Sequence, residues 1–243
     1  MSYVLIIGAK SDIAKELARV YAKNGYNLYL GARNVEELEE VATDIRVRSS
    51  VEVALKEFDI TAFETHAEFY ATLGEKPLGV IVVSGYMTAQ HIAQKEWSES
   101  LNTINVNYTG AVSLLNIVAD DFEKEKRGFI VGVSSVAGDR GRKANYIYGS
   151  AKAAFTTYLS GLRNRLFESG VEVLTVKPGF VATKMTEDLD LPEKLTAQPS
   201  EVAEDIFNAQ QKGKNILYTK WIWRYIMLII KHIPEFMFKK MSI

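Results

Sequence analysis

The sequence of 243 residues contains no cysteine and only three histidines, five prolines and three tryptophans. Without cysteine, disulfide bonds, thiolate nucleophiles and cysteine-ligated zinc or iron–sulfur centres are all excluded. The histidines, His66, His91 and His232, are scattered without the paired spacing of a metal site. We therefore expect no bound metal and assign the histidines no chemical role.

Neither sign of charge dominates, since 29 Lys and Arg face 30 Asp and Glu, for a formal net charge of −1. This balance argues against a nucleic-acid-binding protein. The first residues, Met-Ser-Tyr, lead directly into an apolar run and lack the cationic leader and small-residue cleavage site of a secretory signal. We therefore expect a cytoplasmic location.

Short apolar runs alternate with segments of helical spacing along the chain. The predicted strands lie at 3–8, 26–31, 51–57, 80–83, 128–134, 171–177 and 215–219, and the predicted helices at 11–24, 35–48, 61–73, 97–125, 146–169 and 200–212. Strands that are apolar on both faces belong to parallel sheets covered by helices. We predict an α/β fold: a single Rossmann-type doubly wound parallel sheet with helices on both faces, formed by a catalytic domain of residues 1–219.

The turn after the first predicted strand is a candidate phosphate site. Gly8 to Ala14 connects that strand to a helix, whose first N–H groups and dipole attract a pyrophosphate. Lys10 adds a positive charge, and Ser11 or Asp12 can cap the helix. The Asp12 carboxylate is unfavourable near an anion unless it caps the helix and faces away. An ordinary strand–helix turn is the alternative reading.

A second group of residues, Ser135, Tyr148 and Lys152, suits the reduction of a ketone. Such a reaction needs an acid that protonates the new alkoxide, and the phenol of tyrosine, with a pKa of about 10, is a weak acid. Tyr148 and Lys152 are four residues apart and share a helix face, so a lysine ammonium would lower the pKa of the phenol. Ser135, at a predicted strand end, would orient the carbonyl.

Over essentially its full length the chain resembles the short-chain dehydrogenase/reductase family. The resemblance rests on Gly8–Ala14, Asp59, Ser84-Gly85, Asn107 in Val-Asn-Tyr-Thr-Gly, Ser135, Tyr148-Gly-Ser-Ala-Lys152 and Pro178-Gly179-Phe-Val-Ala-Thr183. The sequence departs from the family pattern at Asp12, Ala14 and Val82-Val83. The candidate cofactor-binding residues are Gly8, Lys10, Ser11, Asp12, Ile13, Arg33, Asp59, Ser84, Gly85, Tyr148, Lys152, Pro178, Gly179, Val181 and Thr183.

The resemblance also implies a mechanism, in which a hydride passes from nicotinamide C4 to the substrate carbonyl. In it Tyr148 is the general acid, Lys152 lowers the Tyr148 pKa and binds the nicotinamide ribose, and Ser135 orients the carbonyl. Asn107 holds a water that relays protons, Asp59 contacts the adenine ring, and Thr183 holds the nicotinamide carboxamide. Members of the family are usually dimers or tetramers, so we expect a homo-oligomer.

The choice of cofactor depends on the residues that follow the second predicted strand. An acid there would bind the ribose 2′-hydroxyl of NAD(H) and repel a 2′-phosphate. The sequence has Gly-Ala-Arg-Asn at 31–34, without an acid, and Arg33 can pair with a phosphate. We therefore favour NADP(H). If Arg33 is simply solvated, NAD(H) is the alternative.

The last 24 residues, 220–243, form a tail that is both basic and aromatic. They contain five cations and one acid, so their formal charge is +4, which leaves −5 for residues 1–219. Residues 221–230 form an apolar run interrupted only by Arg224, which is too short to span a bilayer. Indoles and cations around such a run suit a helix at a membrane interface. Closure of the substrate pocket or an oligomer contact is the alternative.

A closer resemblance concerns 106–113, 148–153, 224–227 and 231–240, which look like the reductase subunits of decaprenylphosphoryl-ribose 2-epimerase systems. Those proteins reduce a 2-keto pentose carried on a polyprenyl phosphate, after a flavoprotein oxidase partner has formed the ketone, and their product serves cell-envelope synthesis. The resemblance implies such a substrate, such a partner and peripheral attachment to the inner membrane face. A cytosolic reductase of a small carbonyl compound and, more remotely, a non-catalytic dinucleotide-binding scaffold are the alternatives.

Overall fold

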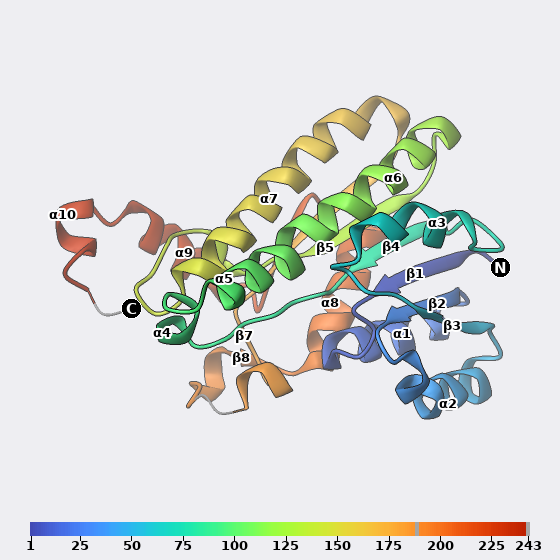
Figure 1. Ribbon diagram of the computed structural model, residues 1–243, viewed down its shortest axis with the longest axis horizontal. Helices are drawn as coiled ribbons and strands as arrows, with labels where there is room; N and C mark the ends of the chain where they lie inside the picture. Colours follow the sequence, from blue (N-terminus) through green and yellow to red (C-terminus); the bar gives the residue numbers. More distant parts are fainter. Residues whose placement is uncertain (188–189, 242–243) are drawn as a thin grey trace.

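The computed structural model describes residues 1–187 and 190–241 and folds them around one parallel sheet (Figure 1). The strand order is β3-β2-β1-β4-β5-β6-β9, and each neighbouring pair is parallel. The strands are β1 (Tyr3–Ile7), β2 (Asn27–Ala32), β3 (Val53–Glu57), β4 (Gly79–Val82), β5 (Phe129–Val133), β6 (Glu172–Pro178) and β9 (Ile216–Thr219). A separate short pair joins β7 (Phe180–Val181) to β8 (Thr196–Ala197).

Helices cover both faces of the sheet, and alternate residues of β1 separate the two cores. Val4 and Ile6 pack in the core beneath α1 (Asp12–Lys23), α2 (Glu39–Ser49) and α8 (Pro199–Gln211). Leu5 and Ile7 pack on the opposite side, beneath α3 (His66–Ala71), α6 (Gly110–Glu125) and α7 (Tyr146–Leu166). The remaining helices are α4 (Gln90–Ala93), α5 (Trp97–Ile104), α9 (Ile222–His232) and α10 (Glu235–Phe238).

This arrangement confirms the predicted doubly wound sheet. The chain moves outward from β1 in one direction through β2 and β3, and then in the other through β4, β5 and β6. At the point where the direction reverses, the loops after β1 and β4 diverge to opposite faces of the sheet. The crevice between them, at the carboxyl ends of the strands, is where such sheets bind ligands.

Three predicted helices differ from the observed ones. The predicted helix at 35–48 begins with a 3₁₀ turn, Val35–Leu38, and Asn34 adopts a left-handed conformation (φ 49°) without capping it through its side chain. Instead, the Glu57 carboxylate accepts the N–H groups of Asn34 and Val35, at 3.0 Å each. Asparagine commonly caps a helix at such a position, but here an acid from the neighbouring strand replaces that cap.

The two other differences also have local causes. The predicted helix at 61–73 is shortened to α3, because Asp59 accepts hydrogen bonds from the N–H and the hydroxyl of Thr61 and turns the chain. The predicted helix at 97–125 is interrupted by one π-helical turn, Asn105–Thr109, between α5 and α6. Such a turn widens the helix locally, and it is common at functional sites.

The C-terminal helices extend from one end of the molecule (Figure 1). Trp223 and Met227, on the inner side of α9, are buried together with Val136. Arg140 ties the tail to the loop after β5, since its guanidinium donates to the carbonyl oxygens of Ile230 and Ile233, at 2.6 Å each. No helix in the described part of the chain is long and apolar enough to cross a membrane.

Candidate active site

The turn after β1 has the geometry of an anion cradle. Ser11 caps α1, and its hydroxyl accepts the N–H of Ala14 at 3.2 Å. Gly8 has a positive φ of 80°, and a Cβ at this position would lie 2.7 Å from the backbone nitrogen of Ser84. Only glycine fits at position 8, because both its backbone angle and the space toward β4 exclude a side chain. The glycine therefore lets this turn pack closely against Ser84, which follows β4, and the N–H groups available to an anion are those of the first turn of α1.

Asp12 does not cap α1. Its carboxylate accepts the backbone N–H of Lys184 at 3.0 Å, across the cleft from the turn. The contact joins the start of α1 to the segment that follows β7. The negative charge of Asp12 is thus directed toward a backbone N–H group that partly neutralises it.

Two adjoining cavities follow the carboxyl edge of the sheet. The first, called here the Arg33 cavity, has a volume of about 490 Å³ and is lined by Gly8, Lys10, Ser11, Arg33, Asp59, Ser84 and Gly85 among others. The second, the Tyr148 cavity, has a volume of about 360 Å³ and is lined by Lys10, Ser11, Asp12, Ile13, Gly85, Ser135, Tyr148, Lys152, Pro178, Gly179, Val181 and Thr183 among others. Because Lys10, Ser11, Val83 and Gly85 line both, the two form one continuous cleft.

Every residue predicted to bind the cofactor lines one of these cavities, although the sequence places them at or after the ends of five separate strands and on α7. At the Arg33 end, burial would raise the pKa of the Asp59 carboxyl, but the hydrogen bonds from the N–H and hydroxyl of Thr61, with a smaller effect of Arg33, lower it overall. Lys10 forms an ion pair with Glu37 at 2.7 Å, so its charge is already engaged. Glu37 is thus an acid near the predicted phosphate site that the sequence analysis did not single out.

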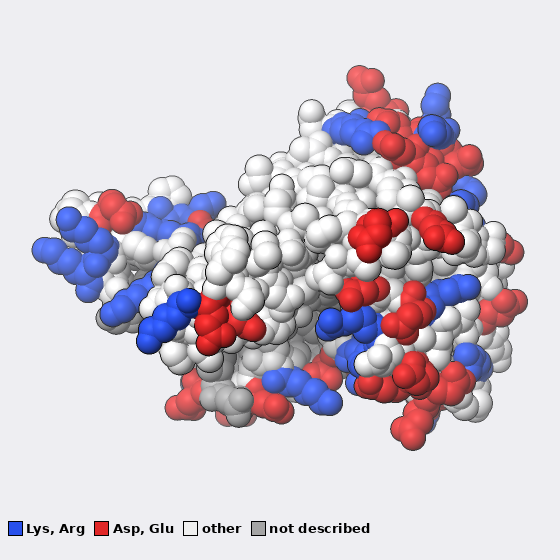
Figure 2. Space-filling model, viewed as in Figure 1, with Lys and Arg blue, Asp and Glu red and all other residues white. Residues whose placement is uncertain are grey.

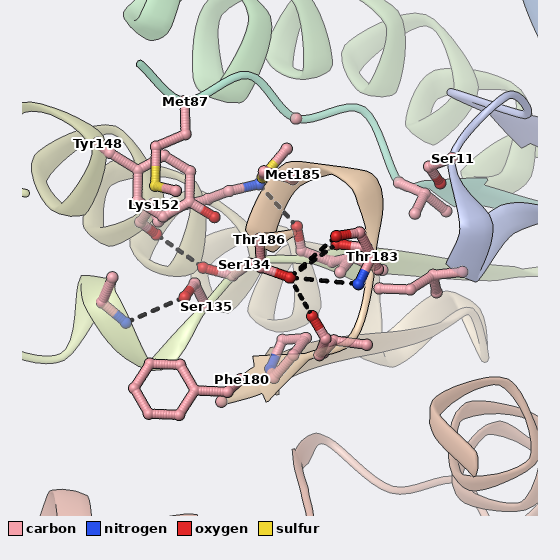
Figure 3. Close-up of a pocket in the computed structure, with 18 of the residues that line it drawn as sticks. Ser11, Met87, Ser134, Ser135, Tyr148, Lys152, Phe180, Thr183, Met185 and Thr186 are labelled. Carbon is pink, nitrogen blue, oxygen red and sulfur yellow. Dashed lines mark hydrogen bonds between the residues drawn. The ribbon is translucent and has the colours of Figure 1, made fainter. Parts of the chain in front are cut away.

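Ser135, Tyr148 and Lys152 lie together at the other end of the cleft (Figure 3). The neighbouring Ser134 fixes α7 against the end of β5, because its hydroxyl bonds to the Lys152 carbonyl oxygen at 2.9 Å and to the Thr156 hydroxyl at 2.8 Å. The Lys152 ammonium lies 5.7 Å from the centre of the Tyr148 ring and donates to the Val133 carbonyl oxygen at 3.0 Å. The predicted trio therefore shares one cavity.

Burial dominates the protonation of this group. It raises the pKa of the Tyr148 phenol to about 12, against a smaller lowering by the Ser135 hydroxyl. It also lowers the pKa of the Lys152 ammonium to about 7. Desolvation therefore sets the direction of the Tyr148 shift, and the lowering of its pKa by Lys152 remains a prediction. At neutral pH Tyr148 keeps its proton.

Asn107 lies behind the cleft and lines neither cavity. Its amide donates to the carbonyl oxygens of Tyr86 and Thr103, at 2.6 and 2.8 Å, and its carbonyl accepts the Tyr86 N–H at 3.3 Å. These bonds join the π-helical turn to the loop after β4. Asn107 therefore holds two segments together, whatever further role it has.

The Tyr148 cavity also contains residues that the sequence analysis did not propose. Met87, Phe180 and Met185 give it an apolar wall (Figure 3), and Arg142 and Asn145 add polar groups. In the sequence, the basic stretch Arg140 to Lys143, in the predicted loop between Ser135 and Tyr148, could have indicated that Arg142 lies at the site.

Comparisons with known proteins agree with this architecture. The model of the short chain dehydrogenase family matches residues 2–194. An uncharacterized oxidoreductase of Mycobacterium tuberculosis is 34% identical over 241 residues, which cover 98% of this chain and 96% of the relative.

Two solved structures share the fold. A short-chain dehydrogenase from Sphingobium yanoikuyae in complex with NADPH has a TM-score of 0.85 at 24% identity, with 97% of each chain covered. The bulky-bulky ketone specific alcohol dehydrogenase from Comamonas testosteroni has a TM-score of 0.82 at 23% identity, with 97% of this chain and 96% of that chain covered.

The doubly wound sheet and the cleft along its carboxyl edge are typical of proteins that bind a dinucleotide. More particularly, the chain belongs to the short-chain dehydrogenase/reductase family and is an NAD(P)-dependent oxidoreductase.

Proposed function

We propose that this protein reduces a ketone with NADPH, with the Tyr148 cavity as the site of the reaction. The observation that carries the proposal is the meeting of Ser135, Tyr148 and Lys152 in a cavity continuous with the predicted dinucleotide cleft. The four residues of the expected mechanism, including Asn107, are all present in the chain. A non-catalytic scaffold would have no need of them, and the family assignment makes the chain an enzyme.

The residues fit the nicotinamide dinucleotide that the family implies. The first turn of α1, beside Gly8, has backbone N–H groups without helical partners that can bind a phosphate. Asp59 lines the Arg33 cavity and is proposed to contact the adenine ring, and Thr183 lines the other end of the cleft. When bound, the reduced nicotinamide supplies a hydride. Arg33, exposed and without an acid beside it on β2, favours the 2′-phosphate of NADP(H) over NAD(H).

In the proposed mechanism each residue of the trio has one task. The Ser135 hydroxyl donates a hydrogen bond to the substrate carbonyl oxygen and orients it. Tyr148, still protonated at neutral pH, gives its proton to that oxygen as the carbon is reduced. Lys152 then stabilises the resulting phenolate through its charge and holds the ribose. Asn107, beside this group, is proposed to keep a water in the path that returns the proton from solvent.

We further propose that the ketone is a sugar carried on a polyprenyl phosphate. The apolar wall of Met87, Phe180 and Met185 suits a substrate with a lipid portion. The tail supports the same idea, because the inner side of α9 packs against Val136 and Phe180 of the cavity wall, while its outer side exposes apolar side chains. Reduction of a small soluble carbonyl compound is the alternative.

The outer side of the tail is the proposed contact with the membrane. Trp221, Tyr225 and Ile229 are 73%, 56% and 68% exposed, and the rings of Trp221 and Tyr225 meet edge to face with their centres 5.8 Å apart. Figure 2 shows Lys and Arg gathered around the same projecting end, with few acids. An apolar stripe bordered by cations is typical of helices that lie at an anionic lipid surface.

A comparison of two ketones and two reduced cofactors tests the proposed reaction. We expect NADPH-dependent reduction of a 2-keto pentose on a polyprenyl phosphate, much slower reduction of the free keto pentose, and a lower kcat/KM with NADH. A flavoprotein sugar oxidase, found by pulldown from the source cells, would supply the ketone. Equal rates with the free sugar would overturn the lipid-carrier part and favour the small-carbonyl alternative. No turnover of any ketone would overturn the proposed function.

A further inference from the structure

Arg142 is a positive charge in the Tyr148 cavity without a partner. It lies in the loop between β5 and α7, and its guanidinium makes no hydrogen bond or ion pair with any residue in 1–187 or 190–241. Its Nε is buried and unpaired within the same ranges. Because arginine cannot release its proton in a protein, the charge is permanent and its desolvation is not repaid. Burial accordingly lowers the pKa of this group.

The nearest acid in the sequence, Asp139, attracts Arg142 through its charge but forms no hydrogen bond or ion pair with it, and burial outweighs that attraction. Both oxygens of the Asp139 carboxylate are engaged, one by the Lys177 ammonium at 2.5 Å and the other by the Tyr218 hydroxyl at 2.7 Å. The other charged residues that line the cavity are three lysines and one acid, Lys10, Lys152, Lys184 and Asp12. Lys10 is paired with Glu37, and burial lowers the pKa of Lys152 to about 7. Even without these two lysines, Arg142 and Lys184 outweigh the single acid Asp12 of the cavity wall.

Asn145, also in the cavity wall, has a free acceptor. It is the N-cap residue of α7, yet its side chain accepts no hydrogen bond from the helix. Its Oδ1 is buried and has no partner in the described part of the chain. Buried polar atoms are nearly always paired, and an exception at a ligand cavity needs an explanation. A cation-lined cavity with an unpaired acceptor is complementary to a ligand that has both an anionic group and a hydroxyl.

Arg142 is also on the substrate side of the cleft. It lines the cavity of Ser135 and Tyr148 but not the Arg33 cavity, where the predicted adenosine end lies. We infer that Arg142 binds an oxyanion on the ketone substrate, and that Asn145 accepts a hydrogen bond from a hydroxyl of the same molecule. The inference rests on the proposed function, in taking the Tyr148 cavity as the substrate site, and deepens it by naming a specificity-determining residue.

Small anions test the inference without turnover. Methyl phosphate and acetate are titrated into the full chain saturated with NADPH, so that the phosphate sites of the cofactor are filled, with ligand-observed NMR as the readout. We expect saturable binding of one or both, weakened at least about tenfold in Arg142→Gln and partly restored in Arg142→Lys. Arg127→Gln, which changes an exposed arginine outside both cavities, is the matched control and should leave the affinity unchanged.

The variants themselves give a second measurement. Because Arg142 forms no bond within the described chain, Arg142→Gln should fold and unfold at a temperature equal to or above that of the parent protein. A lower unfolding temperature would show a structural role and contradict the inference. Glycerol 3-phosphate should bind more tightly than methyl phosphate, and Asn145→Ala should abolish that difference. If the two probes bind equally to the parent protein, the part of the inference that concerns Asn145 is wrong.

The outcomes separate this inference from the proposed function. Anion binding that is absent from the NADPH-saturated protein, or unchanged in Arg142→Gln, overturns the role of Arg142 even if ketones are reduced. Anion binding that depends on Arg142 in a protein that reduces no ketone supports the site and overturns the proposed reaction. Whether methyl phosphate or acetate binds more tightly identifies the oxyanion as phosphate-like or carboxylate-like.

Discussion

At the scale of single residues, the cavity contains a phenol that keeps its proton and an amine that loses one easily. Tyr148→Phe removes the proposed proton donor and changes no backbone contact. We expect kcat to fall by about 10²–10⁴-fold, the usual contribution of a general acid, with NADPH affinity within a factor of about two. Steady-state kinetics and a fluorescence titration of NADPH measure the two effects. Retention of most of the activity would contradict the role of Tyr148.

The buried ammonium of Lys152 leads us to predict how the stability of the protein depends on pH. Burial lowers the pKa of its ammonium to about 7 in the folded protein, against 10.5 for the free side chain. Between these values the unfolded chain binds more protons, so the free energy of unfolding rises with pH from 7 to 10.5. Lys152→Met abolishes this rise. We therefore expect the free energy of unfolding of the variant, relative to that of the parent, to fall by up to about 4 kcal/mol as the pH rises from 7 to 10.5.

Urea unfolding at pH 6.5 and at pH 10 measures the Lys152 effect. Lys23→Met, at an exposed position of α1, is the control and should follow the parent protein at both pH values. Parallel pH profiles for Lys152→Met and the parent would show that Lys152 titrates normally in the folded protein.

At the scale of elements, the π-helical turn between α5 and α6 is held by one side chain. Asn107→Ala removes three hydrogen bonds and leaves the Tyr86 carbonyl oxygen without that partner. We expect the free energy of unfolding to fall by about 2–4 kcal/mol. Asn116→Ala, one exposed hydrogen bond on α6, should change it by less than about 1 kcal/mol. Denaturant unfolding compares the two, and equal effects would contradict the holding role of Asn107.

The segment after β2 gives a prediction about the cofactor. Glu37 pairs with Lys10 at 2.7 Å, and both are near the predicted 2′-phosphate site. Glu37→Gln removes the competing acid, so we expect NADPH to bind about 2–5-fold more tightly, in line with the strength of an exposed ion pair. NADH affinity should hardly change. Glu40→Gln, farther along α2, is the control, and an equal gain for NADH would contradict a 2′-phosphate contact.

The helices and strands also show which parts of the structure could be predicted from the sequence. All seven strands of the main sheet were predictable, because an apolar run such as Val-Leu-Ile-Ile has only one favourable place, the centre of a covered sheet. The 3₁₀ turn after Asn34 was not, because it depends on Glu57, a residue 23 positions away. Ser135, Tyr148 and Lys152 were identifiable from their spacing. Arg142 was not identifiable in this way, because its distinguishing feature, a guanidinium without a hydrogen-bond partner in the described part of the chain, is visible only in the structure.

At the scale of the whole molecule, charge and apolar surface are segregated. The tail, with its formal charge of +4, projects at one end, while the remainder of the chain is acidic overall. Arg140 and Trp223 fasten the inner side of the tail near the Tyr148 cavity, so the outer side has a fixed orientation relative to the reaction site. A surface that binds lipid with this geometry would bring the cavity to a substrate anchored in the same membrane.

The triple variant Tyr225→Ser, Leu228→Ser, Ile229→Ser tests that orientation. The three side chains are at least 55% exposed, so their replacement should leave the unfolding temperature nearly unchanged. We expect the parent protein to sediment with vesicles of phosphatidylcholine and phosphatidylglycerol, less with phosphatidylcholine alone or at high salt, and the variant to bind at least about tenfold more weakly. Val47→Ser with Phe167→Ser, which are 78% and 79% exposed elsewhere, is the control. Because the altered residues lie outside both cavities, reduction of a soluble ketone should continue at the parent rate, whereas reduction of a vesicle-borne ketone should fall with the lost binding. Equal sedimentation of the variant and the parent would instead assign the outer side of α9 to another partner.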